Sequence, residues 1–392
     1  MKEEVRRKAG MRNVITLGVV SFLNDVSTEM VRPMLPTFVI NVLGGTTANW
    51  GLIEGVSEFL SYVLRIPSGI LSDMLRKRKP LALLGYGIST ITKPFLALST
   101  KWTHVLLLKS VDRVGKGIRT APRDAMIAES VKGEKAGRAF GIHRTLDQAG
   151  AVIGPFIAFM LFPMLGYRNL FIASFIPGLL ALLVLSLLAV EVAPQKVIGR
   201  REIINIVRNK VLLLYVIISA VFACSLYSFS YVLIYANAIL GIPDRYLNLV
   251  FIVLNIAHVI IGIPMGILAD KIGIGNGLGI TCLLLSLTSF FMIKNPLGGL
   301  SGALMTGVLY GLFQGGYEAL SRAAIPVLVT SEAKGSAYAL LSLAIATGTA
   351  IANILMGFLW QRYGYNIALY YSLSLSTICA IIMPLIVKRP KG

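Results

Sequence analysis

The feature that most constrains this chain is a series of apolar segments, each about 20 residues long, that recurs from one end to the other. A helix needs about 20 mostly apolar residues to cross the hydrocarbon of a bilayer. A water-soluble globule could not bury so many of them. We therefore predict an all-α polytopic membrane protein with twelve transmembrane helices, near residues 13–41, 48–73, 80–99, 103–124, 138–164, 168–190, 211–240, 247–269, 276–293, 299–325, 336–360 and 366–387.

The composition favours lipid over water as the surroundings of the chain. Hydrophobic residues make up 56% of it and charged residues 14%, whereas soluble proteins carry about 25% charged residues. The net charge of +19 would suggest a nucleic-acid partner on a soluble chain. On an apolar chain it indicates basic cytoplasmic loops, so we expect the lipid bilayer as a partner and no nucleic acid.

The basic residues of the loops indicate the orientation of the chain. One set of loops and both termini are rich in Lys and Arg, including the run 76–79 (RKRK), whereas the opposite loops carry at most one each. Such a bias marks the cytoplasmic side. We predict both termini in the cytoplasm, an uncleaved first helix as the anchor, and a location in the cell membrane. Cys224, Cys282 and Cys379 form no CxxC pair, so we expect no disulfide framework, metal or cofactor.

The longest polar interruption divides the chain into two halves. It predicts a six-helix bundle over 1–190, a cytoplasmic linker over 191–210 and a second six-helix bundle over 211–392. Three short segments of the first half recur in the second at offsets of 197, 198 and 198 residues: 69–73 at 266–270, 135–140 at 333–338, and 166–167 at 364–365. Two parallel six-helix repeats are typical of secondary transporters.

Three motifs carry a resemblance to the major facilitator superfamily. They are Gly69-x-x-x-Asp73 before Arg76, echoed at Gly266-x-x-x-Asp270; Arg113-x-x-Lys116-Gly117; and Gly150-x-x-x-Gly154-Pro155. The last one resembles the antiporter motif of proton-coupled drug exporters. The resemblance implies a gating role for Gly69, Asp73, Arg76 and Asp270. It also implies a close and bendable helix contact between the halves at Gly150, Gly154 and Pro155.

Charged residues inside the spans are the main candidates for a functional site. A charge at the bilayer centre costs at least about 2.5–3.5 kcal/mol and usually faces the bundle interior. The predicted network or substrate site consists of Glu54, Glu58, Asp112, Arg113, Lys116, Arg119 and Arg144. The alternative is a set of fixed ion pairs that only stabilise the bundle.

Proton coupling requires a carboxyl group that changes its protonation between the two access states. Burial favours the protonated form, and a nearby cation favours the ionised form. Asp25 and Glu29 share one helical face, and Arg113 or Lys116 could supply the cation. We predict Asp25 or Glu29 as the proton carrier and Asp147 as the second choice.

The second half is less charged, and we expect it to shape the substrate pocket. The candidate pocket residues are Tyr231, Tyr235, Asn255, Gln314, Glu318 and Arg322. A basic fourth span would also suit an anionic substrate. However, nine cations in or near the spans of the first half (Arg32, Arg65, Lys93, Lys109, Arg113, Lys116, Arg119, Arg123, Arg144) face seven acids (Asp25, Glu29, Glu54, Glu58, Asp112, Asp124, Asp147). This near balance indicates that most of them are paired.

These observations predict a secondary active transporter that works by alternating access. The favoured function is proton-coupled efflux of a small molecule, such as a drug or metabolite, by a monomer. The alternative is proton-coupled uptake or exchange of an organic or inorganic anion, and another ion could replace the proton. The sequence contains no HExxH, GxSxG or P-loop motif, so we do not expect an enzyme.

Overall fold

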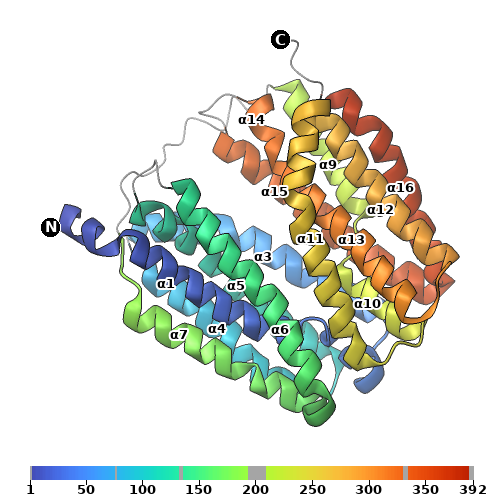
Figure 1. Ribbon diagram of the computed structural model, residues 1–392, viewed down its shortest axis with the longest axis horizontal. Coiled ribbons are helices and arrows are strands. Elements are labelled where there is room, and N and C mark those ends of the chain that lie inside the picture. The colour runs from blue at the N-terminus through green and yellow to red at the C-terminus, as the bar shows by residue number, and fades with distance from the viewer. Residues whose placement is uncertain (1, 76, 132–135, 193–208, 330–333, 388–392) are drawn as a thin grey trace. The chain divides into compact units, whose positions relative to one another are not determined.

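The computed structural model describes residues 2–75, 77–131, 136–192, 209–329 and 334–387, and no strand occurs within these ranges. The all-α prediction is therefore confirmed. The helices are α1 (Lys2–Val31), α2 (Leu35–Thr37), the π-helix η1 (Phe38–Val42), α3 (Thr47–Leu75), α4 (Lys79–Ala97), α5 (Trp102–Ser130), α6 (Ala136–Ala173), α7 (Phe175–Leu188), α9 (Lys210–Ser225), α10 (Phe229–Ala238), α11 (Asp244–Ile272), α12 (Ile274–Lys294), α13 (Gly299–Ala323), α14 (Ile325–Leu328), α15 (Lys334–Tyr363) and α16 (Tyr365–Ile386) (Figure 1).

The described helices account for the twelve predicted spans. Seven described segments are long and apolar enough to cross a bilayer. One of them, Gly137–Leu188, has 52 residues and is long enough for two crossings. Helices α3, α4, α5 and α13 supply the other four, and the polar and charged residues within them lower their apolarity.

The chain divides into two compact units. The first comprises residues 1–44 and 56–198, and the second comprises 45–55 and 199–392. Helix α3 is shared, because its first residues belong to the second unit and the rest belongs to the first. The domain limits predicted from the sequence stay a prediction, and most of the predicted linker lies outside the described residues.

Both units use the same pattern of helix pairs. In the first unit α1 packs against α6 and α7, and α4 packs against α5 and α7 (Figure 1). In the second unit α9 packs against α15 and α16, and α12 packs against α13 and α16. A cluster that includes Leu17, Tyr86 and Leu185 forms a core of the first unit. The repeat seen in the sequence is therefore a repeat of packing.

Glycines at matching positions explain why the helices approach so closely in both units. A Cβ atom added at Gly150 would lie 2.6 Å from the backbone oxygen of Phe22, and one at Gly348 would lie 2.6 Å from that of Ala220. The two glycines are 198 residues apart, which is the offset of the sequence repeat. Small residues at such contacts let membrane helices pack backbone to backbone.

Candidate functional site

Two acidic side chains of the first unit meet between α1 and α6. The carboxyl groups of Asp25 and Asp147 lie within reach of each other and interact electrostatically. Gly150 allows this approach, because a Cβ added there would lie only 3.0 Å from the Cβ of Asp25. Arg144 reaches Asp147 at 3.6 Å, although about half of its side chain is exposed.

Glu29 lies one helical turn beyond Asp25 and is buried. Its Oε1 forms an ion pair with Nη1 of Arg32 at 3.1 Å. Its Oε2 is buried and has no hydrogen-bond donor among the described residues. Gly154 packs against this turn of α1. The three predicted carboxyl groups therefore lie along one contact between α1 and α6.

A second cluster surrounds Glu58 on α3. Nε of Arg113 lies 3.1 Å from its Oε1, and Arg113 is 3% exposed. Lys116, Arg32 and Lys109 also interact electrostatically with the same carboxylate. The structure thus brings together Glu58, Arg113 and Lys116, as the sequence predicted, within a group of cations.

Other residues of the predicted network have described partners of their own. Glu54 belongs to the second unit, where it is 2% exposed and accepts a hydrogen bond of 2.9 Å from Ser228. Glu54 and Glu58 are one helical turn apart on α3, and the prediction that places both in one network stays a prediction. Arg119 donates to Oγ of Ser89 at 2.5 Å, and Asp112 interacts electrostatically with it.

Arg119 also stacks its guanidinium over the ring of Tyr86, 4.6 Å from the ring centroid. Aromatic faces attract such cations, and the stacking fixes one side of α5 to α4. The guanidinium of Arg119 therefore has partners in the Ser89 hydroxyl, the Tyr86 ring and Asp112. No described contact links it to the Glu58 cluster.

The predicted gating motif is organised by Arg78, which belongs to the basic run 76–79 that follows the motif. Nη2 of Arg78 forms a 3.0 Å ion pair with Oδ1 of Asp73, and Nη1 pairs with Glu129 of α5. Gly69 lies beside Ala121 of the same helix. Arg76 lies outside the described residues. Arg78 thus joins the end of α3, the start of α4 and the end of α5.

Next to Arg78, Glu191 and Lys79 form hydrogen bonds that connect the start of α4 with the end of α7. The Glu191 carboxylate accepts hydrogen bonds from the backbone amides of Arg78 at 2.8 Å and Lys79 at 2.9 Å. Nζ of Lys79 in turn donates to the carbonyls of Ser186 and Ala189 at the C-terminal end of α7. Glu191 therefore stabilises the N-terminus of α4, and Lys79 stabilises the C-terminus of α7, because acids are favourable near helix N-termini and cations near C-termini. Only the basic run 76–79 signalled this site in the sequence.

The antiporter-like motif lies within one unit. Gly150 and Gly154 both pack on the backbone of α1, and Pro155 is buried in α6. The motif predicts a contact between the halves, whereas the close contacts of these two glycines are internal to the first unit. The reason is that the fifth span pairs with the first span of its own half.

In the second unit, two of the predicted pocket residues form hydrogen bonds to backbone carbonyls. The hydroxyl of Tyr231 donates to the carbonyl of Asn353 at 2.9 Å, and that of Tyr235 donates to the carbonyl of Met292 at 2.7 Å. Both side chains are 1% exposed or less. Both side chains therefore lie in the packed interior of the second unit, and their place in a substrate pocket stays a prediction.

The other second-unit candidates lie on α11 and α13. Oε2 of Glu318 pairs with Nε2 of His258 at 3.0 Å. Oε1 of Gln314, one turn away, is buried without a hydrogen-bond donor among the described residues. Asn255 is partly buried on α11. Two further predicted residues, Arg322 and Asp270, are exposed near the ends of their helices.

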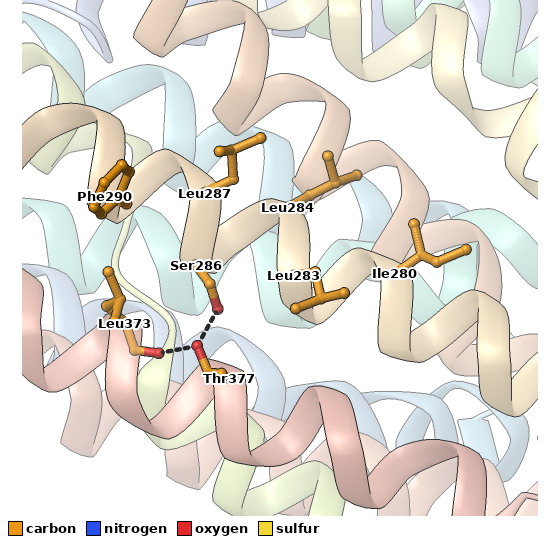
Figure 2. Close-up of a pocket in the computed structure, with 8 residues that line it drawn as sticks. All are labelled: Ile280, Leu283, Leu284, Ser286, Leu287, Phe290, Leu373 and Thr377. Carbon is orange, nitrogen blue, oxygen red and sulfur yellow. Dashed lines mark hydrogen bonds between the residues drawn. The ribbon is translucent and has the colours of Figure 1, made fainter. Parts of the chain in front are cut away.

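A groove of 480 Å³ lies between α12 and α16 of the second unit. Its lining residues are Ile280, Leu283, Leu284, Ser286, Leu287, Phe290, Leu373 and Thr377 (Figure 2). The hydroxyl of Thr377 donates to Ser286 at 3.0 Å and to the carbonyl of Leu373 at 2.7 Å. The groove is apolar, with half-exposed leucines, and contains none of the predicted site residues. We therefore place the candidate site at the charged clusters.

Two helical repeats, membrane-spanning helices and buried charges define a multi-pass membrane transporter of the secondary type. The chain belongs to the Major Facilitator Superfamily, whose family model matches residues 17–293 and 215–392. An MFS-type transporter of Methanocaldococcus jannaschii is 34% identical over 363 residues, covering 89% of each chain.

More distant relatives and solved structures share the family and the fold. The multidrug resistance protein MdtG of Klebsiella pneumoniae is 24% identical over 94% of this chain and 92% of its own length. The multi-drug resistance efflux pump PmrA of Streptococcus pneumoniae is 31% identical over 50% of each chain. A mutant of the nucleoside transporter NupG superposes with a TM-score of 0.84 at 14% identity, covering 96% of this chain and all of that one. The family and fold are those of transporters, which are not enzymes.

Proposed function

We propose that this transporter exports a small molecule and is driven by protons, with the Asp25–Asp147 pair as the proton-binding site. The observation that carries the proposal is the approach of the two carboxyl groups at the close α1–α6 contact made by Gly150. Because two like charges this close cannot both ionise readily, the pair retains a proton that either carboxyl group can release. Such a shared proton is what a coupled transporter needs to load and unload.

Cations near the pair provide a way to release that proton. Arg144 and Arg123 act electrostatically on Asp147, and Lys116 acts on Asp25. A small movement of α6 along α1 would change these distances, and a closer cation favours the ionised form. The glycine contacts at Gly150 and Gly154 support this, because a contact without side chains permits helices to slide or bend.

Glu29 serves in this proposal as the second acceptor on the same helix face. Its pairing with Arg32 leaves one buried oxygen without a donor among the described residues. A proton leaving Asp25 would find this oxygen one helical turn away. The direction of transport rests on weaker support, namely the antiporter-like motif and the distant multidrug efflux relatives.

The test uses full-length protein in proteoliposomes that contain a fluorescent pH indicator. A panel of acidic, basic and neutral organic compounds is added in turn, and proton movement is recorded with each. We expect Asp25→Asn and Asp147→Asn to abolish pH-gradient-driven accumulation of the responding compound while exchange without a gradient persists. Glu29→Gln should slow coupled transport.

The matched control is Asp244→Asn, which removes an acid at the start of α11 in the second unit. It should transport like the wild type. If Asp25→Asn and Asp147→Asn both retain gradient-driven accumulation, the proton site is elsewhere. Gene disruption separates export from uptake: loss of an exporter raises sensitivity to its substrate, whereas loss of an importer prevents growth on it.

A further inference from the structure

The apolar groove between α12 and α16 lies in a surface that suits lipid. Along residues 280–290 the exposed side chains of α12 are Leu283, Leu287 and Phe290, each about half exposed (Figure 2). Both helices are long and apolar enough to cross a bilayer. An exposed apolar face on a membrane-spanning helix contacts hydrocarbon, because that is the solvent around it. The groove of 480 Å³ is therefore a hollow in the surface that faces lipid.

The hydroxyl groups that line the groove are already hydrogen-bonded to the protein. Oγ1 of Thr377 donates to Oγ of Ser286 at 3.0 Å, and Oγ of Ser286 lies 2.7 Å from Oγ of Ser376. The other lining side chains are aliphatic or aromatic. The groove therefore offers many small dispersion contacts, which a flexible hydrocarbon chain can use.

The length of the groove along α12 matches one leaflet of a bilayer. Its lining residues on α12 run over 280–290, which at about 1.5 Å per residue is about 15 Å. The hydrocarbon core is about 30 Å thick, so the groove covers about half of it. Helix α12 has 21 residues and ends at Lys294, because Asn295 has a left-handed backbone with φ of 44°. The groove thus ends one helical turn before the end of the span.

A cation lies at that end of the groove. Nζ of Lys294 is 6.0 Å from the centroid of the Phe290 ring, and Phe290 lines the groove. The ring face attracts the ammonium group and keeps it close to the groove. Lys294 is exposed, and lysines near the ends of membrane helices extend to the interface, where lipid head groups lie. An apolar groove with a cation at its interfacial end is complementary to an acyl chain joined to a phosphate.

We propose that this groove binds one anionic phospholipid, with an acyl chain between α12 and α16 and the phosphate beside Lys294. The lipid site lies on different residues from the charged clusters and does not depend on the proposed transport function. A chain bound in the groove packs against both helices at once, so it stabilises the second unit.

Lipid titrations of purified full-length protein in dodecyl maltoside micelles test the site. The probes are dioleoyl-phosphatidylglycerol and dioleoyl-phosphatidylcholine, which share their acyl chains and differ in head-group charge. Native mass spectrometry counts the bound lipids, and the unfolding temperature reports stabilisation, because a ligand of the folded state raises it. We expect one phosphatidylglycerol per chain to bind more tightly than phosphatidylcholine and to raise the unfolding temperature further. High salt should reduce this preference, because it screens exposed charges.

Two variants separate the head group from the acyl chain. Lys294→Gln removes the cation, so phosphatidylglycerol should bind about fivefold more weakly while phosphatidylcholine is unaffected. Leu287→Trp fills the groove and should weaken the binding of both lipids. The controls are Lys101→Gln, an exposed cation before α5, and Leu187→Trp, a 77% exposed position on α7. Both controls should bind the two lipids like the wild type.

Equal affinity of wild type and Lys294→Gln for phosphatidylglycerol would overturn the inference, and so would unchanged lipid binding by Leu287→Trp. Because Lys294→Gln changes an exposed side chain, it decides the question even if Leu287→Trp proves unstable. A second copy of this chain is the alternative occupant, and light scattering in the same micelles detects it. A dimer that Leu287→Trp converts to a monomer without loss of lipid would make the groove a dimer interface and the proposal wrong.

Discussion

The α3–α5 crossing of the first unit and the α11–α13 crossing of the second share their backbone packing but not their charges. Gly117 lies against the backbone of Ser61, and Gly315 lies against that of His258. The two glycines are 198 residues apart, so they are equivalent positions of the repeat. In both units the absence of a side chain lets two spans touch.

The charges beside these crossings differ in kind. Glu58 of the first unit is surrounded by cations, whereas Glu318 of the second pairs with one histidine and is 42% exposed. The comparison separates two requirements. Close packing of the helices is common to both repeats and belongs to the fold, whereas the cation cluster occurs in one repeat and is a candidate for function.

The strongest test of this difference is Glu58→Gln. Removing one partner of a buried pair leaves the other charge uncompensated, which costs about 3–5 kcal/mol. We expect the unfolding free energy to fall by about 3 kcal/mol, measured by denaturant titration in micelles. The double variant Glu58→Gln/Arg113→Gln should recover part of the loss, because it also removes the cation that pairs directly with Glu58. Equal losses in single and double variants would show that the cluster is not electrostatic.

If close helix packing is common to both repeats, equivalent glycine substitutions should destabilise both units equally. Gly117→Ala and Gly315→Ala each place a Cβ against a backbone carbonyl, and such overpacking costs about 1–3 kcal/mol. Both should lower the unfolding temperature to a similar degree. The controls Gly87→Ala in α4 and Gly262→Ala in α11 have nothing within 4 Å of the added Cβ and should be neutral or stabilising. A loss confined to one unit would contradict the shared packing.

A smaller effect is expected where the two units differ in the turns that precede α4 and α12. In the first unit Glu191 accepts from two backbone amides at the start of α4. In the second unit α12 instead begins after Gly273, whose φ is 94°. Loss of a side-chain cap costs about 1 kcal/mol. Glu191→Ala should therefore lower stability by about that amount, whereas Asn276→Ala near the second turn should have less effect in the same melting assay.

The smallest effect is expected at the charge pair of the second unit. His258→Gln removes a pair whose carboxylate is 42% exposed, and exposed pairs contribute about 0–1 kcal/mol. Its unfolding temperature should stay close to that of Arg322→Gln, an exposed control on α13. A loss as large as that of Glu58→Gln would mean that the two units do not differ in the way proposed.

The sequence predicted the spans and the repeat because both depend on periodic apolar segments and on residue spacing. It also named Asp25 and Asp147, since charges inside spans are rare. It could not assign Glu54 and Glu58 to different units, because one helical turn on a single helix gives no tertiary information. Nor could it show that Tyr231 donates to a backbone carbonyl, because that depends on how neighbouring spans pack.

The glycine crossings have a further consequence for how these helices hold together in lipid. Where Gly117 and Gly150 face carbonyl oxygens, the Cα hydrogens are placed to donate weak Cα–H···O bonds. Water does not compete for those oxygens in the hydrocarbon layer, and lipid tails offer no donor of their own. Glycine at these positions is therefore more than a space left open: its own methylene group becomes the donor that joins one backbone to the next.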